Sequence, residues 1–219
     1  MNIRRITILT FFAILTLSLI IFGMLKMLNK EVPLSKQSPE KIKAKQERYI
    51  NQNGYMSEGK KDSDVHVVVF IDYLCPTCRK YEQNIKKKLE NKYISNRKIK
   101  YTEIPYPVVN KDSTKYASMA RVIHKYGDIK TLQKYADKSF QSSTVDKDPL
   151  KTLERLDIDT DLKSKLTKEY KDNPPNANKS EINSKLGIAE TPTIFVNGKH
   201  VSQGTLLEEV INQEIEKYN

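Results

Sequence analysis

The sequence has only two cysteines, Cys75 and Cys78, and three histidines, His66, His124 and His200, among its 219 residues. A structural zinc site usually takes four protein ligands, commonly from two cysteine or histidine pairs. No second cysteine pair exists here, and the histidines are not spaced as ligands. We therefore expect no metal site and no other cofactor, and we expect the three histidines to be ordinary surface or packing residues.

The chain also lacks a strong charge bias. Its formal net charge is +11, but four of the bases lie in the first thirty residues, which hold no acid, so the remainder has an excess of seven. Lysines and acids alternate through most of this remainder, a pattern that indicates solvated helix faces and not a phosphate-binding stripe. We expect no nucleic-acid partner. No internal repeat is visible in the sequence.

No charged residue occurs from Ile6 to Leu25, a run of twenty residues with the sequence ITILTFFAILTLSLIIFGML. As a helix, this run is long enough to cross a hydrocarbon core of about 30 Å. The alternative is a cleaved secretory signal, which has a shorter apolar region and a small-x-small cleavage site. Neither feature is present, and no nearby cysteine could accept a lipid. Residues 1–30 are therefore predicted to be an uncleaved transmembrane signal-anchor in a single-pass membrane protein.

Residues 31–62 are polar and rich in lysine, and they are predicted to form a tether in which Ser38-Pro39 starts a short helix. A domain over residues 63–219 follows. Its first strand is expected over 65–71, a helix from Cys75 to about Tyr93, and a second strand over 99–107. Together these make a β-α-β unit, which requires a parallel sheet and a right-handed crossover. The predicted fold class is α/β.

A helical insertion is predicted over residues 110–185, because apolar residues recur there at helical spacing and Gly127 ends the first helix. Further helices are expected after Asp128, after Asp148-Pro149 and after Thr160, and a short one before Gly187. The chain then returns to a β-hairpin over 193–202, closed by Asn197-Gly198. Thr205 and Glu208 are spaced as a capping box for a final amphipathic helix, whose apolar residues are Leu206, Leu207, Val210, Ile211 and Ile215.

The spacing of Cys75 and Cys78 permits a disulfide, part of a metal site, or two small apolar residues. A structural role for a disulfide between them is not favoured, because this bond closes almost no loop in the unfolded chain. A cysteine hydrolase needs a histidine base near Cys75, which a sequence cannot exclude, but it leaves the second cysteine unexplained. Redox chemistry is the hypothesis that uses both thiols.

Redox chemistry also suits the predicted position of the thiols. Cys75 stands where a strand passes into a helix, with Pro76 in the first helical turn. The free backbone N–H groups and positive dipole of a helix start stabilise a thiolate. Because the thiolate both attacks and leaves in disulfide exchange, Cys75 is predicted to be the exposed partner and Cys78 the resolving one.

Two motifs together resemble the DsbA-like branch of the thioredoxin superfamily, and most of all its membrane-tethered members from Gram-positive bacteria. They are FIDYLCPTC, ending at Cys78, and LGIAETPTIFVNGK, beginning at Leu186. The resemblance covers about residues 54–219 and implies a thioredoxin-like fold with a helical insertion. It also implies that Cys75 and Cys78 are catalytic and that Pro76 and Thr77 complete the active-site motif.

The resemblance further implies that the Thr191-Pro192 bond is cis and that its loop faces the cysteines, where it presents backbone to a substrate. Relatives often carry an acid on the strand six positions before the first cysteine. That position is Val69 in this chain, and Asp72, which has the opposite strand parity, is assigned to the corner instead.

The expected function is that of an extracytoplasmic, membrane-anchored thiol-disulfide oxidoreductase. The Pro76-Thr77 dipeptide looks like the oxidising branch, which favours an oxidase that acts on exported cysteine-containing proteins. The resemblance assigns its re-oxidation to a DsbB-like membrane partner that uses quinone. A reductase, an isomerase and a tethered chaperone-like module with incidental cysteines remain the alternatives.

Overall fold

The computed structural model describes residues 11, 13–22, 24, 34–142, 148–177, 179–202 and 205–218. The chain divides into two compact units, Met1–Lys36 and Gln37–Asn219. In the first unit, residues 13–22 are helical and Leu34–Lys36 forms the short 3-10 helix η1. Among the described residues, no helix is both long and apolar enough to cross a bilayer. The rest of the predicted anchor lies outside the described residues.

The second unit holds the predicted domain. Its elements are, in chain order, α2 (Pro39–Asn53), β1 (Glu58–Gly59), β2 (His66–Ile71), α3 (Pro76–Tyr81), η2 (Glu82–Lys86), α4 (Lys87–Leu89), η3 (Glu90–Ile94), β3 (Lys100–Pro105), α5 (Lys111–Tyr126), α6 (Ile129–Ser142), α7 (Pro149–Glu154), α8 (Thr160–Asp172), α9 (Lys179–Leu186), β4 (Thr193–Val196), β5 (Lys199–Val201) and α10 (Leu207–Glu216).

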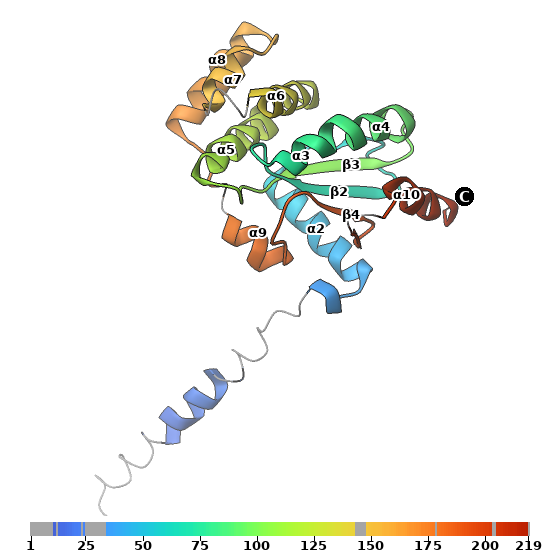
Figure 1. Ribbon diagram of the computed structural model, residues 1–219. Helices are drawn as coiled ribbons and strands as arrows, with labels where there is room; N and C mark the ends of the chain where they lie inside the picture. Colours follow the sequence, from blue (N-terminus) through green and yellow to red (C-terminus); the bar gives the residue numbers. More distant parts are fainter. Residues whose placement is uncertain are drawn as a thin grey trace, which may run out of the picture. The chain divides into compact units, whose positions relative to one another are not determined.

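The five strands form one sheet in the order β1-β3-β2-β4-β5 (Figure 1). Strand β2 is its centre, and all six of its residues are buried. It pairs in parallel with β3, as the predicted β-α-β unit requires, and antiparallel with β4. The helix between β2 and β3 runs without a break from Pro76 to Ile94, although η2 and η3 are π-helical turns.

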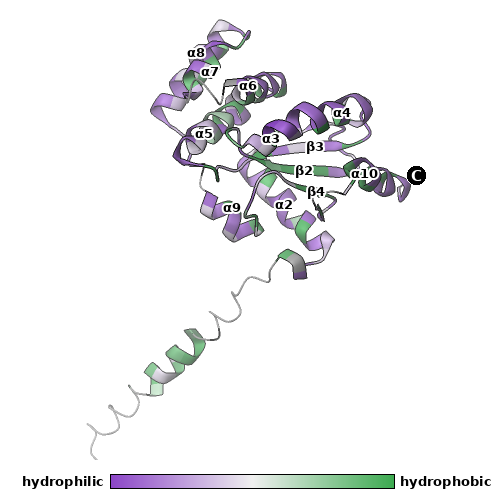
Figure 2. Ribbon diagram, viewed as in Figure 1, coloured by the Kyte–Doolittle hydropathy of each residue, from purple (hydrophilic) through white to green (hydrophobic). Residues whose placement is uncertain are grey.

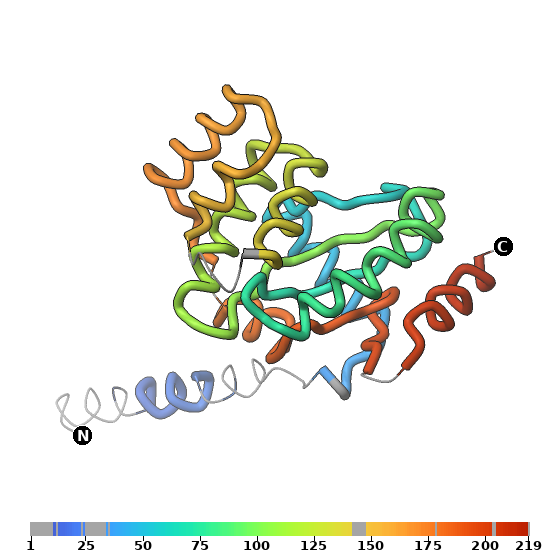
Figure 3. Tube along the Cα trace, turned by 45° about the horizontal axis from the view of Figure 1, so that its top comes forward, coloured from blue at the N-terminus to red at the C-terminus, as the bar shows by residue number. Residues whose placement is uncertain are grey.

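The side chains of successive β2 residues point to opposite faces of the sheet. Val67, Val69 and Ile71 join the main apolar cluster, to which α3, α5 and α6 contribute. The opposite face carries Phe70, which packs edge-on against Phe195 of β4, and is covered by α2 (Figures 1 and 3). Hydrophobic residues accordingly gather in the central strand β2, and the helices of the second unit are mostly hydrophilic on their outer surfaces (Figure 2).

The predicted helical insertion is present as α5 to α8. Asn110 caps α5 with a reciprocal pair of hydrogen bonds to Ser113, and α5 ends at Gly127 as expected. Asp148 accepts a hydrogen bond from the Leu150 N–H at the start of α7, and Asp159 accepts one from the Leu162 N–H in the first turn of α8. Each of these helices therefore begins at a residue whose side chain satisfies an otherwise unpaired donor.

Part of the segment predicted to be a tether is an ordered helix of the second unit. Ser38 accepts a hydrogen bond from the Lys41 N–H at the start of α2, and Gly54 ends the helix in the left-handed conformation. The helix start at Ser38-Pro39 is confirmed. The side chains of Tyr49 and Ile50 are buried, so the amphipathic face of α2 is packed against the domain.

The predicted capping box of the last helix is wrong. Helix α10 begins at Leu207 with Leu206 as its cap and has no side-chain capping bond. The Thr205 hydroxyl lies 3.1 Å from the Ser202 hydroxyl instead. Leu206, predicted to lie on the apolar face of this helix, is 64% exposed. Because α10 starts one residue later than the capping-box spacing requires, Leu206 stays outside the buried stripe.

Candidate active site

The corner after β2 is held by the carboxylate of Asp72. One carboxylate oxygen accepts a hydrogen bond from the Leu74 N–H at 2.9 Å, and the other accepts from the N–H groups of Val108 and Val109 at 2.8 and 2.9 Å. The Cys75 N–H donates to the Asp72 carbonyl at 3.0 Å. Asp72 thus fixes the turn that presents the first thiol, which is the corner role expected for it.

Cys75 occupies the cap position of α3, in extended conformation, with Pro76 as the first helical residue. Cys75 is 8% exposed, and Cys78, one helical turn further on, is fully buried. The Thr77 hydroxyl oxygen lies 2.9 Å from the Cys75 Sγ. The Asp72 N–H lies 3.5 Å from the Cys78 Sγ. The two thiols therefore differ in access and in hydrogen-bond partners.

These surroundings move the pKa values of the two thiols apart. The hydrogen bond from the Cys78 thiol is the largest influence that lowers the pKa of Cys75 to about 4, and the Thr77 hydroxyl and the Cys78 backbone N–H add to it against the opposing effect of burial. Burial raises the pKa of the Cys78 thiol far above its ordinary value. At neutral pH the pair therefore holds a thiolate on Cys75 and a proton on Cys78.

The loop before β4 lies directly against Cys75. Its Thr191-Pro192 bond is cis, as the resemblance implied. The Thr191 carbonyl oxygen is 3.5 Å from the Cys75 Sγ and 3.4 Å from the Thr77 hydroxyl oxygen. The loop is brought there by the pairing of β4 with β2, in which Thr193 stands opposite Phe70.

A family model described as Thioredoxin matches residues 51–214, the range that holds both the CPTC pair and the Thr191-Pro192 loop. The chain belongs to the thioredoxin family. A "Disulfide bond formation protein D" from Bacillus subtilis is 29% identical over 167 residues, covering 73% of this chain and 74% of the relative. A "Probable disulfide bond formation protein D" from Bacillus anthracis is 28% identical over 173 residues, covering 74% and 78%.

Solved structures of this family agree with the fold. BdbD from Bacillus subtilis in oxidised form has a TM-score of 0.62 and 25% identity, and the match covers 76% of this chain and 95% of that one. The thiol-disulfide exchange protein alpha-DsbA2 from Wolbachia pipientis has a TM-score of 0.59 at 24% identity, over 83% and 97% of the two chains. The chain is thus a DsbA-like thiol-disulfide oxidoreductase with a thioredoxin-like fold and a helical insertion, as the two motifs led us to expect.

A groove of about 740 Å³ opens beside this thioredoxin-type site. Thr77 and Pro192 line its end next to Cys75, and the helix after Cys75, the β4-β5 hairpin and α10 line the rest. Ile85, which follows Tyr81 at helical spacing, is 39% exposed in this groove, and the 64% exposed Leu206 lies in it too. Sequence spacing found the apolar residues but could not distinguish groove from core.

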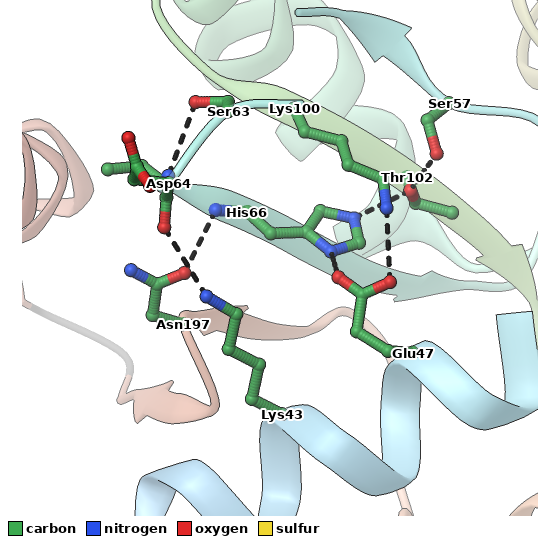
Figure 4. Close-up of polar contacts among 10 residues, drawn as sticks. Lys43, Glu47, Ser57, Ser63, Asp64, His66, Lys100, Thr102 and Asn197 are labelled. Atoms are coloured by element: carbon green, nitrogen blue, oxygen red, sulfur yellow. Dashed lines mark hydrogen bonds and ion pairs between the residues drawn. The ribbon is translucent and has the colours of Figure 1, made fainter. Parts of the chain in front are cut away.

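The predicted surface or packing histidines have different environments. His200 is exposed on β5, whereas His66 and His124 are buried. Figure 4 shows His66 between Glu47 of α2 and Thr102 of β3, with nitrogen-to-oxygen distances of 2.5 and 2.7 Å. A hydroxyl, an imidazole and a carboxylate in line are the parts of a hydrolase triad. Thr102 has no exposed surface, so no substrate can reach it, and the network ties α2 to the sheet.

Two neighbouring acids, Glu103 and Glu82, were not predicted from the sequence. Val69 is apolar and fully buried, so the strand position six residues before Cys75 carries no acid. Glu103 stands directly opposite Val69 on β3, and Glu82 lies on η2. Glu103 is 7% exposed. The residues next to Glu103 in the sequence predicted only an extended strand.

Among the described residues, no group of three or more histidines, cysteines or acids is arranged to hold a metal ion.

Proposed function

We propose that this protein is an oxidase that introduces disulfides into exported proteins through Cys75 and Cys78. The position of the Cys75 sulfur carries the proposal. It lies at a helix start, at the mouth of an apolar groove, within 2.9 Å of the Thr77 hydroxyl and 3.5 Å of the Thr191 carbonyl. A client cysteine that approaches along the groove meets the Cys75 sulfur, at which the mixed disulfide forms.

The exchange proceeds in two steps. A client thiolate attacks the Cys75 sulfur of the Cys75-Cys78 disulfide, and Cys78 leaves with the bonding electron pair and takes up a proton. A second client thiolate attacks the client sulfur of this mixed disulfide, and Cys75 leaves as a thiolate. The client has then lost two electrons and gained a disulfide, and the enzyme is reduced.

The stability of the Cys75 thiolate supports transfer in the oxidising direction. In thioredoxin the attacking cysteine has a pKa of about 7, and in the oxidant DsbA it is about 3.5. The pKa of Cys75 is lowered to about 4. A stable thiolate stabilises the reduced enzyme, and this makes the disulfide a stronger oxidant. The comparison supports an oxidase over a reductase or an isomerase.

Substrate contact and location complete the proposal. The Thr191-Pro192 loop offers backbone to an extended client segment, and Pro76 and Thr77 shape the rim around Cys75. Residues 6–25 anchor the chain in the cell membrane, and the domain faces the extracytoplasmic side. A DsbB-like, quinone-linked membrane oxidase re-oxidises the enzyme there. The apolar run and the disulfide-forming relatives support this location, because disulfides persist in oxidising compartments.

The reduction potential tests this function. The full chain in detergent is equilibrated in defined glutathione buffers, and the fraction of Cys75-Cys78 disulfide is measured. A value near about −120 mV supports the oxidase, and one near about −270 mV supports a reductase. In cells, a Cys78→Ser variant should accumulate mixed disulfides through Cys75. A Cys75→Ser, Cys78→Ser variant with full biological activity would instead support a chaperone-like module.

A further inference from the structure

The groove beside Cys75 adjoins a second hollow at the end that lies away from the thiols. This hollow, which we call the distal pocket, has a volume of about 400 Å³. It lies between the end of η3, the loop before β2 and α10. Lys92 and Asn212 line both the groove and the distal pocket. A chain laid along the groove from the redox site therefore arrives at the distal pocket.

The distal pocket is basic. Its lining holds one acid, Asp64, and four bases, Lys60, Lys92, Arg97 and Lys98. Lys92 is already paired, at 2.7 Å, with Glu208 of α10. Arg97 and Lys98 are exposed, and within the part of the chain that the structure describes neither side chain forms an ion pair. These two cations are available to an anionic group from outside the protein.

The groove between the thiols and the distal pocket is mainly apolar. Tyr81 and Ile85 line it from the helix after Cys75, and Ile194, Val201 and Leu206 line it from the opposite side. Its charged lining nearly cancels, with three lysines and two glutamates. An apolar segment in the groove would remove the exposed Ile85 and Leu206 from water. The path thus offers apolar contacts first and positive charge at its end.

The length of the helix after Cys75 sets the spacing between the thiol and the bases. Thr77, beside Cys75, and Lys92, where the distal pocket begins, are fifteen residues apart in a helix that runs without a break. This helix segment measures about 20 Å, which an extended chain covers in about six residues. A bound segment with its cysteine at Cys75 therefore brings residues beyond about the sixth near Arg97 and Lys98.

We propose that the groove and the distal pocket together bind an extended client segment in which apolar residues lie next to the cysteine and acidic residues begin about six positions away. The inference rests on the proposed oxidation of clients and names the chemistry of the clients that the enzyme favours. Arg97 and Lys98 are the specificity-determining residues. They hold the acidic end of the segment while the client thiolate attacks the Cys75 sulfur.

The test measures how fast the oxidised full chain, in an uncharged detergent, oxidises short dithiol peptides. Each peptide carries two cysteines at one end, an apolar middle, and a run of glutamate, serine or lysine that begins about six residues from the cysteines. Each is also made in reversed order, so that both chain directions are covered. The peptide dithiol becomes a disulfide and the Cys75-Cys78 disulfide becomes a dithiol, so the electrons balance. Acid quenching, alkylation and mass spectrometry give the rate constants.

The wild type should favour the acidic peptide. In one of the two orders it should react about 10-fold faster than the serine peptide at low salt, because two exposed ion pairs each contribute a factor of about 3. This advantage should disappear at about 1 M salt, where charges are screened beyond about 3 Å. It should also disappear when the glutamates are moved next to the cysteines, since they then lie too far from Arg97 and Lys98.

Charge reversal gives the decisive variant. Arg97→Glu, Lys98→Glu should reverse the preference, so that the lysine peptide reacts faster than the glutamate peptide. Both side chains are exposed, so the variant should fold. Lys130→Glu, Lys138→Glu on α6 is the matched control, because it changes the net charge equally at exposed positions that line neither the groove nor the distal pocket. The control should keep the preference of the wild type.

The outcomes separate this inference from the function on which it rests. Equal rates for the acidic and serine peptides in the wild type would overturn the inference and leave the oxidoreductase in place. An equal loss of preference in the two double variants would also overturn it, because net charge alone would then be responsible. If Arg97→Glu, Lys98→Glu keeps the peptide preference but no longer retains phosphatidylglycerol mixed into the micelles, the distal pocket binds lipid headgroups instead of clients. If the wild type oxidises no dithiol peptide, the proposed function itself fails.

Discussion

The Thr77 hydroxyl offers the most direct control over the oxidising strength of the site. It lies 2.9 Å from the Cys75 Sγ and contributes to the low pKa of that thiol. Thr77→Val keeps the shape of the side chain and removes the hydroxyl. Because the reduced enzyme carries its negative charge on Cys75, the substitution should destabilise the reduced form and leave the disulfide form nearly unchanged.

The size of the effect follows from the geometry. A hydrogen bond to a charged group contributes about 1.5–3 kcal/mol, and we take the lower limit because Thr77 is exposed to solvent. About 1.5 kcal/mol corresponds to roughly one pKa unit and to about 30 mV for a two-electron couple. The pKa of Cys75 should therefore rise by about one unit, and the reduction potential should fall by about 30 mV.

Two assays measure the two quantities independently. The ultraviolet absorbance of the thiolate, followed against pH, gives the pKa of Cys75, and equilibrium with glutathione gives the potential. Thr77→Ser keeps a hydroxyl and is the control that should retain both values. A Thr77→Val protein with an unchanged pKa, or with a changed pKa and an unchanged potential at neutral pH, would refute the reasoning, because the two are linked through the same thiolate.

Three other measurements follow from the ionisable groups. Because the pKa of Cys75 is lowered to about 4, Cys75 is ionised at neutral pH, and reduction of the disulfide takes up one proton per two electrons. The reduction potential should therefore fall by about 30 mV per pH unit near neutrality, whereas a dithiol with two ordinary thiols gives about 59 mV. The raised pKa values of Glu82 and Glu103 mean that the folded state holds extra protons; the free energy of unfolding should fall as pH rises from about 4.5 to about 8, and Glu103→Gln should flatten this slope in urea titrations. Glu47→Ala leaves buried His66 without its carboxylate partner and should lower the free energy of unfolding by about 1–3 kcal/mol; an unchanged urea midpoint would show that the contact between α2 and the sheet contributes nothing.

The elements that the sequence predicted well are those whose signals are local. The β-branched run that became β2, the Asn197-Gly198 turn, the end of α5 at Gly127 and the start of α7 at Asp148-Pro149 each act through their own neighbours in the chain. The cysteine pair could be assigned for the same reason, because two residues fix its spacing and the start of α3 fixes its electrostatics.

The features that were missed depend on contacts between distant segments. Glu103 became a buried acid because β3 pairs with β2 under the active-site helix, and no local pattern marks such a residue. Ile85 and Leu206 have the spacing of core residues, yet the neighbouring helix and hairpin leave a groove above them. The packing of α2 likewise depends on Glu47 meeting His66 and Lys100 of the sheet.

The pairing of β2 with β4 has a consequence for how this protein can change over time. The Thr191 carbonyl reaches Cys75 because Thr193 is in register with Phe70, and this ladder does not depend on the long stretch of chain between β3 and β4. The helices α5 to α8 can therefore gain, lose or reshape residues on their outer surfaces, away from the apolar cluster that α5 and α6 share with β2, while the two halves of the redox site keep their separation. The surface around the site can diverge there without disturbing the chemistry.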